Sequence, residues 1–185
     1  MDRTSDDALM SQVSDGDVEK LGLLFERHHV RLFNYLWRLS GDRETAEDLV
    51  QEVFVRMIKY RGSFRARGEF AAWMFALARN ASADYFERSK RRQTTTDEEL
   101  AELPSEAPLP QERLESAESV ERLRAALLRL PADKREILLL SRDGDLSCEQ
   151  IGGLLGCSAG TVRVRVHRAL RSLQQLFQGP GMEAS

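Results

Sequence analysis

Residues 147–177 constrain the fold more than any other part of this chain, because they read as two short helices around a tight turn. Ser147 can accept a hydrogen bond from a free amide at a helix start, and Gln150 can reach back to complete a capping box. Gly156 supplies the left-handed residue that ends this helix. Ser158 can cap the next one. The spacing therefore predicts a helix-turn-helix.

The second helix of this stretch has an apolar side and a basic side. Its apolar residues recur at three- and four-residue steps and predict one buried stripe, made of Val162, Val166, Ala169, Leu170, Leu173 and Phe177. The polar positions left to face outward are Thr161, Arg163, Arg165, His167, Arg168 and Arg171. No acidic residue falls between Cys157 and Phe177. A helix of this kind is typical of DNA major-groove binding, while an ordinary helical hairpin with a solvated basic face is the alternative.

The net charge of −3 argues at first against a nucleic-acid partner, but its distribution along the chain argues for one. Residues 61–92 carry eight Arg and Lys against three acidic residues. Residues 93–119 carry eight acidic residues and a single arginine. Electrostatic attraction to phosphate acts over about 10 Å at moderate salt, so the local charge matters more than the total.

Four helices are expected before this acidic segment, over residues 5–13, 18–39, 42–60 and 68–92. Of the adjacent residues His28 and His29, one is expected in the core and one at the surface. In the third helix Val55 falls among polar residues, so it is a candidate for the apolar centre of a protein-binding face. In the fourth, Trp73 shares a stripe with Asn80 and Asp84, which suits an unstacked base, although Trp73 could equally cap the core.

The remaining features bound the class of protein. The prolines and acidic residues of segment 93–113 indicate a linker, which separates expected domains at residues 1–92 and 114–178, with a tail at 179–185. The second domain should open with helices over 116–130 and from Pro131, so the fold class is all-α. No catalytic motif and no membrane-spanning run occurs. Two cysteines with no close ligand pair predict no metal site, no cofactor and a reduced, cytoplasmic protein.

Five segments together resemble the bacterial RNA polymerase sigma factors of the extracytoplasmic-function (ECF) group, in the sigma-70 family. They are Ala46–Phe54, Phe70–Asn80, Leu130–Leu139, Leu146–Ile151 and Leu155–Val162. The likeness covers nearly the whole chain, in the expected order, and the acidic linker falls between the two expected domains. The sequence differs from the family pattern at three places. Gly152-Gly153 stands where the family commonly has Ala-Glu, and Met57 stands where it often has tryptophan. Val164 replaces a residue that is usually small and polar.

The resemblance implies a protein that binds core RNA polymerase and directs it to promoter DNA, with an anti-sigma protein as a further partner. It implies that the polymerase contacts Asp48, Gln51, Glu52, Val55, Arg56 and Lys59. It assigns recognition and melting of the −10 element to Arg65, Arg67, Trp73, Arg79, Asn80, Asp84, Arg88, Lys90, Arg91 and Arg92. It assigns the −35 element to the helix that begins at Ser158 and carries Thr161, Arg163, Arg165, His167, Arg168 and Arg171.

Two other classes fit parts of the sequence. A repressor or activator would use the helix-turn-helix to bind duplex DNA alone, which leaves the Asp48–Lys59 face and Trp73 unexplained. A pure interaction protein, such as a mimic that binds an anti-sigma factor, would need no basic recognition helix. An enzyme that acts on nucleic acid fits least, because no carboxylate cluster or metal motif is present.

Overall fold

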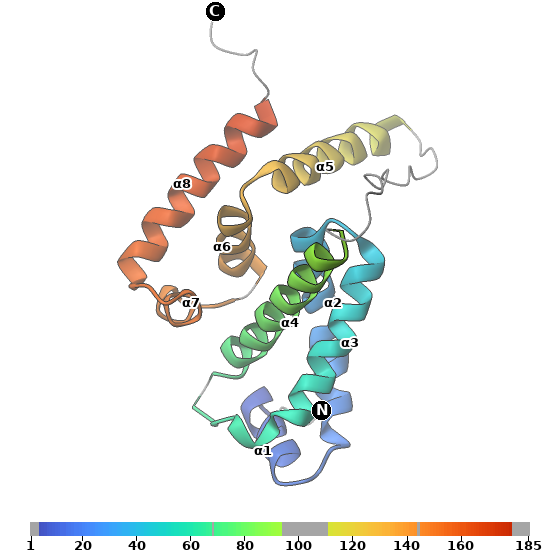
Figure 1. Ribbon diagram of the computed structural model, residues 1–185, viewed down its shortest axis with the longest axis vertical. Coiled ribbons are helices and arrows are strands. Elements are labelled where there is room, and N and C mark those ends of the chain that lie inside the picture. The colour runs from blue at the N-terminus through green and yellow to red at the C-terminus, as the bar shows by residue number, and fades with distance from the viewer. Residues whose placement is uncertain (1–3, 68, 94–110, 144, 179–185) are drawn as a thin grey trace, which may run out of the picture.

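The structure is a computed structural model, and it describes residues 4–67, 69–93, 111–143 and 145–178 (Figure 1). Within these ranges it contains helices and connecting turns and no strand, which confirms the all-α prediction. The helices are α1 (Asp6–Ser14), α2 (Lys20–Ser40), α3 (Arg43–Lys59), η1 (Arg61–Ser63), α4 (Phe70–Gln93), α5 (Gln111–Arg129), α6 (Ala132–Asp143), α7 (Cys148–Leu155) and α8 (Ala159–Gln178). Most of the expected linker, residues 94–110, and the expected tail lie outside the described residues.

Helices α1 to α4 form an N-terminal unit whose ends are set by short polar residues. Ser5 caps α1 by accepting a hydrogen bond from the amide of Ala8. Asp42 caps α3 by accepting one from the amide of Thr45 at 2.7 Å. Hydrogen bonding from the Thr45 side chain and from its amide holds the pKa of the Asp42 carboxyl below its ordinary value. Between α2 and α3, Gly41 adopts a left-handed φ of +83°. This conformation ends α2 and lets a short turn connect the two helices.

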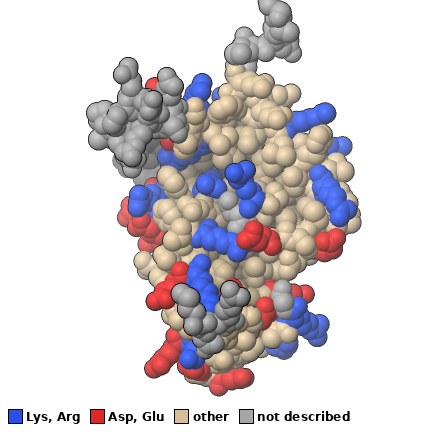
Figure 2. Space-filling model, turned by 180° about the vertical axis from the view of Figure 1, so that it is seen from behind, with Lys and Arg blue, Asp and Glu red and all other residues tan. Residues whose placement is uncertain are grey.

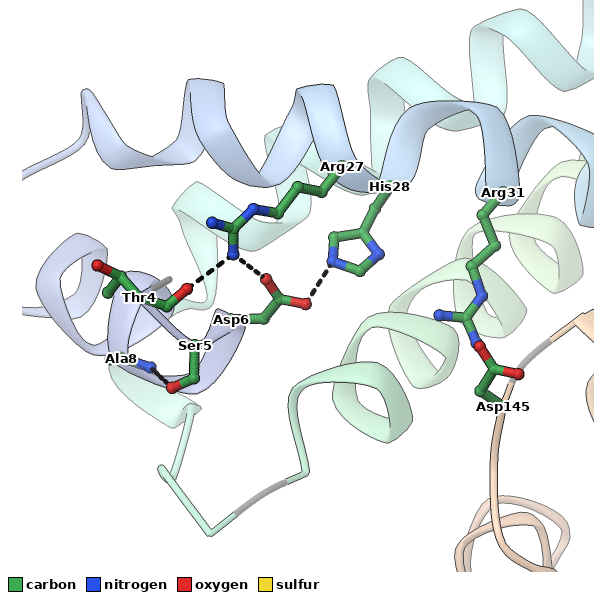
Figure 3. A network of polar contacts seen from close by, with 8 residues as sticks. All are labelled: Thr4, Ser5, Asp6, Ala8, Arg27, His28, Arg31 and Asp145. Atoms are coloured by element: carbon green, nitrogen blue, oxygen red, sulfur yellow. Dashed lines mark hydrogen bonds and ion pairs between the residues drawn. The ribbon is translucent and has the colours of Figure 1, made fainter. Parts of the chain in front are cut away.

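The core of the N-terminal unit contains one of the two adjacent histidines. His28 is buried, and its Nε2 lies 2.7 Å from Oδ2 of Asp6 (Figure 3). Asp6 also accepts a hydrogen bond from Arg27 at 2.7 Å, so one carboxylate ties α1 to α2. His29 is half-buried and stacks on Phe25 at 4.8 Å between ring centroids. The interpretation of one packed histidine is confirmed, and the second is less exposed than expected.

Helices α5 to α8 form a C-terminal unit in which α8 packs on α5, α6 and α7. Helix α5 begins at Gln111, five residues before the expected start, because Gln, Glu, Arg and Leu at these positions all favour helix. Pro131 precedes α6, where its missing amide leaves no bond unmade. Lys134 of α6 donates a hydrogen bond to the Ser172 hydroxyl of α8 at 2.9 Å. These contacts fix α8 against the rest of its unit.

The two units touch each other directly. Helix α6 lies along α2, and α7 approaches α4, so that the C-terminal unit covers one side of the N-terminal unit (Figure 1). Cys148 and Cys157 are both half-buried and free. No described helix is both long enough and apolar enough to cross a membrane.

Candidate nucleic-acid interface

The turn between α7 and α8 has the expected capping box and glycine. The amide of Gln150 donates to the Ser147 hydroxyl at 3.2 Å, and the amide of Ser147 donates to the Gln150 side chain at 2.9 Å. Gly156 has a φ of +64°, the left-handed value that the helix stop requires. The helix-turn-helix is therefore built from its own sequence signals.

The two glycines of α7 differ in what surrounds them. A Cβ atom at Gly152 would lie 2.5 Å from the carbonyl oxygen of Cys157, whereas one at Gly153 would meet nothing within 4 Å. Gly152 therefore has a packing role beyond its effect on helix propensity. Its missing side chain allows the close approach of the turn, and the Cys157 amide donates to the Gly152 carbonyl at 2.9 Å. Only Gly153 is a plain loss of helix propensity.

The start of α8 carries two neighbouring hydroxyl groups, those of Ser158 and Thr161. Ser158 accepts a hydrogen bond from the Thr161 amide at 3.1 Å, which confirms its role as the cap. Its hydroxyl also lies 2.9 Å from that of Thr161. A helix start with exposed hydroxyls suits a phosphate, because the amides and the helix dipole both favour negative charge.

The outward face of α8 is basic, as the sequence predicts. Arg165, His167, Arg168 and Arg171 are exposed. Arg163 is exposed as well, and its guanidinium lies 3.8 Å from the Glu149 carboxylate of α7. Val164 lies among them with half of its surface exposed.

The predicted apolar stripe of α8 is partly wrong. Val162 and Ala169 are buried, and Val166 and Leu173 are half-buried, but Leu170 and Phe177 are exposed. Leu176 packs against the core instead. The error arises because an α-helix has 3.6 residues per turn, so repeated four-residue steps rotate successive positions around the helix axis. A stripe of this length therefore cannot keep every apolar position facing the core. The guanidinium of Arg122 covers the Phe177 ring, with 5.6 Å to its centroid.

The residues expected at the −10 element lie on α4 and on the loop before it, and they differ in availability. Trp73 is half-buried, and its ring meets the edge of Phe64 at 5.3 Å. Asn80 is exposed. Arg79 is half-buried and paired with Glu136 of α6 at 2.7 Å. Asp84 pairs with Arg56 of α3 at 2.8 Å, so its carboxylate ties two helices together.

The other basic residues of this group lie at the two ends of α4. Arg65 and Arg67 are exposed, on either side of Ala66, and follow Phe64, which is buried and anchors the loop. Arg65 donates to the carbonyls of Gly62 and Phe64, each at 2.9 Å. At the far end, the residues with exposed side chains are Arg88, Lys90 and Arg91, and the side chain of Arg92 lies outside the described residues. Basic side chains are also prominent over the middle and upper part of the back of the molecule (Figure 2).

The expected polymerase-binding face lies on α3. Asp48, Gln51, Val55 and Lys59 are exposed, and 58% of the Val55 surface is open to solvent. Glu52 and Arg56 are half-buried and joined at 2.7 Å. Burial lowers the pKa of Arg56, but its bonds to Glu52 and Asp84 outweigh this and raise that pKa above its ordinary value. The face is therefore an exposed valine within a charged rim, with Arg56 fixed rather than mobile.

Sequence comparisons assign the chain to a known family. The profile named Sigma-70 region 2 matches residues 24–92, and the profile named Sigma-70, region 4 matches residues 120–173. The ECF sigma factor EcfG of Rhodopseudomonas palustris is 34% identical over 145 residues, which is 78% of each chain. This chain belongs to the ECF RNA polymerase sigma factors.

Two further relatives place this ECF sigma factor among known proteins. The ECF sigma factor SigE of Mycolicibacterium smegmatis is 34% identical over 82% of this chain, which spans only 59% of SigE. The structure of the sigma factor RpoE in complex with the anti-sigma factor NepR, from Bartonella quintana, superposes with a TM-score of 0.68. It is 26% identical, and the match covers 86% of this chain and 97% of that one.

Sequence reasoning missed the residues that join the two units of this sigma factor. Arg31, Arg124, Arg135 and Glu136 all make contacts across the boundary. The only signal was the Arg135-Glu136 pair within a family-like segment, and it did not reveal the partners. Across the described ranges, no cluster of His, Cys, Asp and Glu has the composition of a metal site.

Proposed function

We propose that this ECF sigma factor binds core RNA polymerase and directs it to promoters. The outward face of α8 carries the proposal, because it combines a capped helix start with exposed arginines and has no acidic residue of its own. Arginine forks match guanine edges and phosphates, while the hydroxyls of Ser158 and Thr161 suit phosphates. We assign this helix to duplex DNA at the −35 element.

We propose that the N-terminal unit handles the −10 element and the polymerase. Trp73 and Asn80 offer a ring and an amide to an unstacked base, and Arg65, Arg67, Arg88, Lys90 and Arg91 offer charge to phosphates. The polymerase surface is the α3 face around Val55. In this division, residues 1–92 and 114–178 act as separate domains, and 93–113 links them. The protein acts in the cytoplasm, without catalysing a reaction itself.

We further propose an anti-sigma protein as a regulatory partner, because the RpoE structure that superposes on this chain contains the anti-sigma factor NepR. Repression by the helix-turn-helix alone is less favoured. It gives no role to the exposed Val55 within its charged rim, and region 2 of the sigma-70 family matches residues 24–92.

Run-off transcription tests the proposal. Purified core RNA polymerase should produce promoter-dependent transcripts only when this protein is added. Duplex binding in a gel shift without polymerase, together with no transcript in its presence, would favour the repressor instead. An anti-sigma partner is tested separately, by co-purification of the full chain with a candidate encoded beside it.

A further inference from the structure

Helix α1 touches the part of the chain that carries two exposed arginines of the proposed −10 surface. It lies against α2, η1 and α4 (Figure 1). We name residues 61–67, which include η1 and lead toward α4, the arginine loop. The Sigma-70 region 2 profile begins at residue 24, so its match does not include α1. The contacts of α1 with the arginine loop are therefore a feature of this chain that the profile match does not describe.

The first of these contacts holds the start of the arginine loop. The Ser14 hydroxyl, at the end of α1, donates to the Arg61 carbonyl at 3.0 Å. This bond is partly buried and joins residues 47 positions apart in the sequence. The same carbonyl accepts a hydrogen bond from the Phe64 amide at 3.1 Å. The turn that begins the loop is therefore fixed both from within the loop and from α1.

The second contact lies beyond the other end of the arginine loop, where the chain enters α4. The amide of Glu69, the residue before α4, donates to Oδ1 of Asp7 at 3.2 Å. The first amides of a helix have no partner within it, and a carboxylate placed beside them is stabilising. Asp7 of α1 thus completes the start of α4 from a different helix.

Helix α1 is itself fixed on α2, so it can support the loop. Its buried residues are Leu9, Met10 and Val13. The Asp6 carboxylate bonds both Arg27 and His28 of α2, each at 2.7 Å (Figure 3). The two side chains that hold the arginine loop therefore belong to a helix that is anchored by apolar burial and by polar bonds.

The spacing of the two contacts explains why the middle of the arginine loop projects. Asp7 and Ser14 are seven residues apart, which is about two helical turns and about 10 Å along α1. A chain from residue 61 to residue 69 could extend to about 27 Å. Because its ends are held by groups much closer together than this, residues 64–67 cannot run straight between them. Arg65 and Arg67 lie in this part of the chain and are exposed.

We propose that Asp7 and Ser14 are positioning residues for recognition and opening of the −10 element, because they fix both ends of the segment that presents Arg65 and Arg67. This role rests on the proposed function, which assigns the two arginines to the −10 element. A segment that is already held in one conformation loses less conformational freedom on binding than a mobile one. Helix α1 thereby strengthens contacts with DNA that it does not make itself.

A matched pair of full-length double variants tests this role. Asp7→Ala with Ser14→Ala removes both side chains that hold the segment. Asp15→Ala with Ser11→Ala is the control, because it removes a carboxylate and a hydroxyl from the same region. The Ser11 hydroxyl donates within α1, to the Asp7 carbonyl, and Asp15 is exposed just after the helix. Asp7→Asn keeps an acceptor oxygen for the Glu69 amide and should behave as wild type.

Limited digestion with trypsin, which cleaves after arginine, measures how firmly the arginine loop is held. Mass spectrometry identifies the cuts after Arg65 and Arg67. Cleavage there requires local opening, so its rate follows the population of open conformations. The Asp7→Ala, Ser14→Ala variant should be cut about tenfold faster than wild type through the loss of two hydrogen bonds, and the control should be cut at the wild-type rate. Equal rates in this variant and wild type overturn the role of α1.

Promoter opening separates positioning from general stability. On a template that supports run-off transcription, permanganate reactivity at the −10 element should fall several-fold for the Asp7→Ala, Ser14→Ala variant, with core polymerase binding unchanged. Unchanged opening in a variant whose loop is freed overturns the positioning role, and so does a joint fall of opening and polymerase binding. If this variant loses its helical circular dichroism, Asp7→Ala alone is measured and judged by the same criteria.

The digestion needs neither polymerase nor DNA. Failure of run-off transcription would therefore reject the proposed function, while the rates of cleavage after Arg65 and Arg67 would still decide whether α1 holds the arginine loop.

Discussion

Helices α8 and α4 are both rich in arginine, yet some arginines of α4 are bound within the molecule where those of α8 face solvent. Arg165, Arg168 and Arg171 project from α8 into solvent. On α4, Arg79 is held by Glu136, and Arg88 donates to the backbone carbonyl of Asp84 at 3.0 Å. Equal numbers of arginines on two helices therefore do not mean equal readiness to bind phosphate.

The difference has an energetic meaning. An exposed arginine gives up mainly side-chain freedom when it contacts DNA. Arg79 must also leave a carboxylate from which water is largely excluded, and a Glu136 left behind without its partner is costly. We expect duplex binding by α8 to be available in the free protein, and binding through α4 to depend on what the rest of the molecule does.

The largest expected effect concerns the close turn between α7 and α8, which positions α8. Gly152→Ala places a methyl group against the Cys157 carbonyl and should lower the free energy of unfolding by about 2–3 kcal/mol. Gly153→Ala is the matched control, since that site is open, and it should raise stability by about 1 kcal/mol. Urea unfolding monitored by circular dichroism measures both. Equal effects of the two changes would contradict the close approach.

The second prediction concerns the exposed arginines themselves. Arg165→Ala should reduce promoter-dependent transcription about tenfold or more, since a good arginine–base or arginine–phosphate contact contributes about 1–3 kcal/mol. Core polymerase binding should be unchanged. Arg129→Ala, an exposed arginine on α5, is the control. If polymerase binding falls together with transcription, the role given to Arg165 is wrong.

The third prediction moves to α4. Trp73→Ala should reduce promoter opening several-fold, by the loss of about 1 kcal/mol of base stacking, and should affect duplex binding less. Permanganate footprinting reports the opened bases. Because Trp73 also packs on Phe64, thermal unfolding of the variant must be measured alongside. Unchanged opening would show that Trp73 only covers the core.

The smallest expected effect concerns the ion pairs of the N-terminal unit. Burial raises the pKa of the Asp6 carboxyl, but its bonds to Arg27 and His28 outweigh this and hold that pKa below its ordinary value. Such a group stabilises the fold above its unfolded-state pKa of about 3.9, and this contribution is lost as pH falls through the folded value.

Asp6→Asn should therefore destabilise the protein at pH 7 by less than about 1 kcal/mol, because the pair is partly exposed. The difference from wild type should shrink as the pH is lowered toward 3. Asp17→Asn changes an exposed ion pair and should cause almost no difference in stability from wild type. Urea midpoints at pH 7 and pH 3 provide the measurement. A difference from wild type that grows as the pH is lowered would exclude the assigned cause.

The local architecture was predictable because its signals are local. Ser147, Gln150, Gly156 and Ser158 each satisfy helix ends within a few residues, so spacing alone places them. The contact between the units was not predictable. Arg79 and Glu136 are 57 residues apart, and nothing in a charged residue reveals a distant partner. The same reason explains why the sequence did not reveal that Arg79 is paired.

Phe64 has a consequence for how the arginine-bearing loop can change. Its ring is buried against Phe70 and Trp73. The loop is therefore fixed by packing at this residue as well as at its two ends. Residues inserted after Phe64 would displace Arg65 and Arg67 while leaving the packing of α4 unchanged. A single aromatic side chain thereby separates the part of the loop that evolution or an engineer can retune from the part that must be preserved.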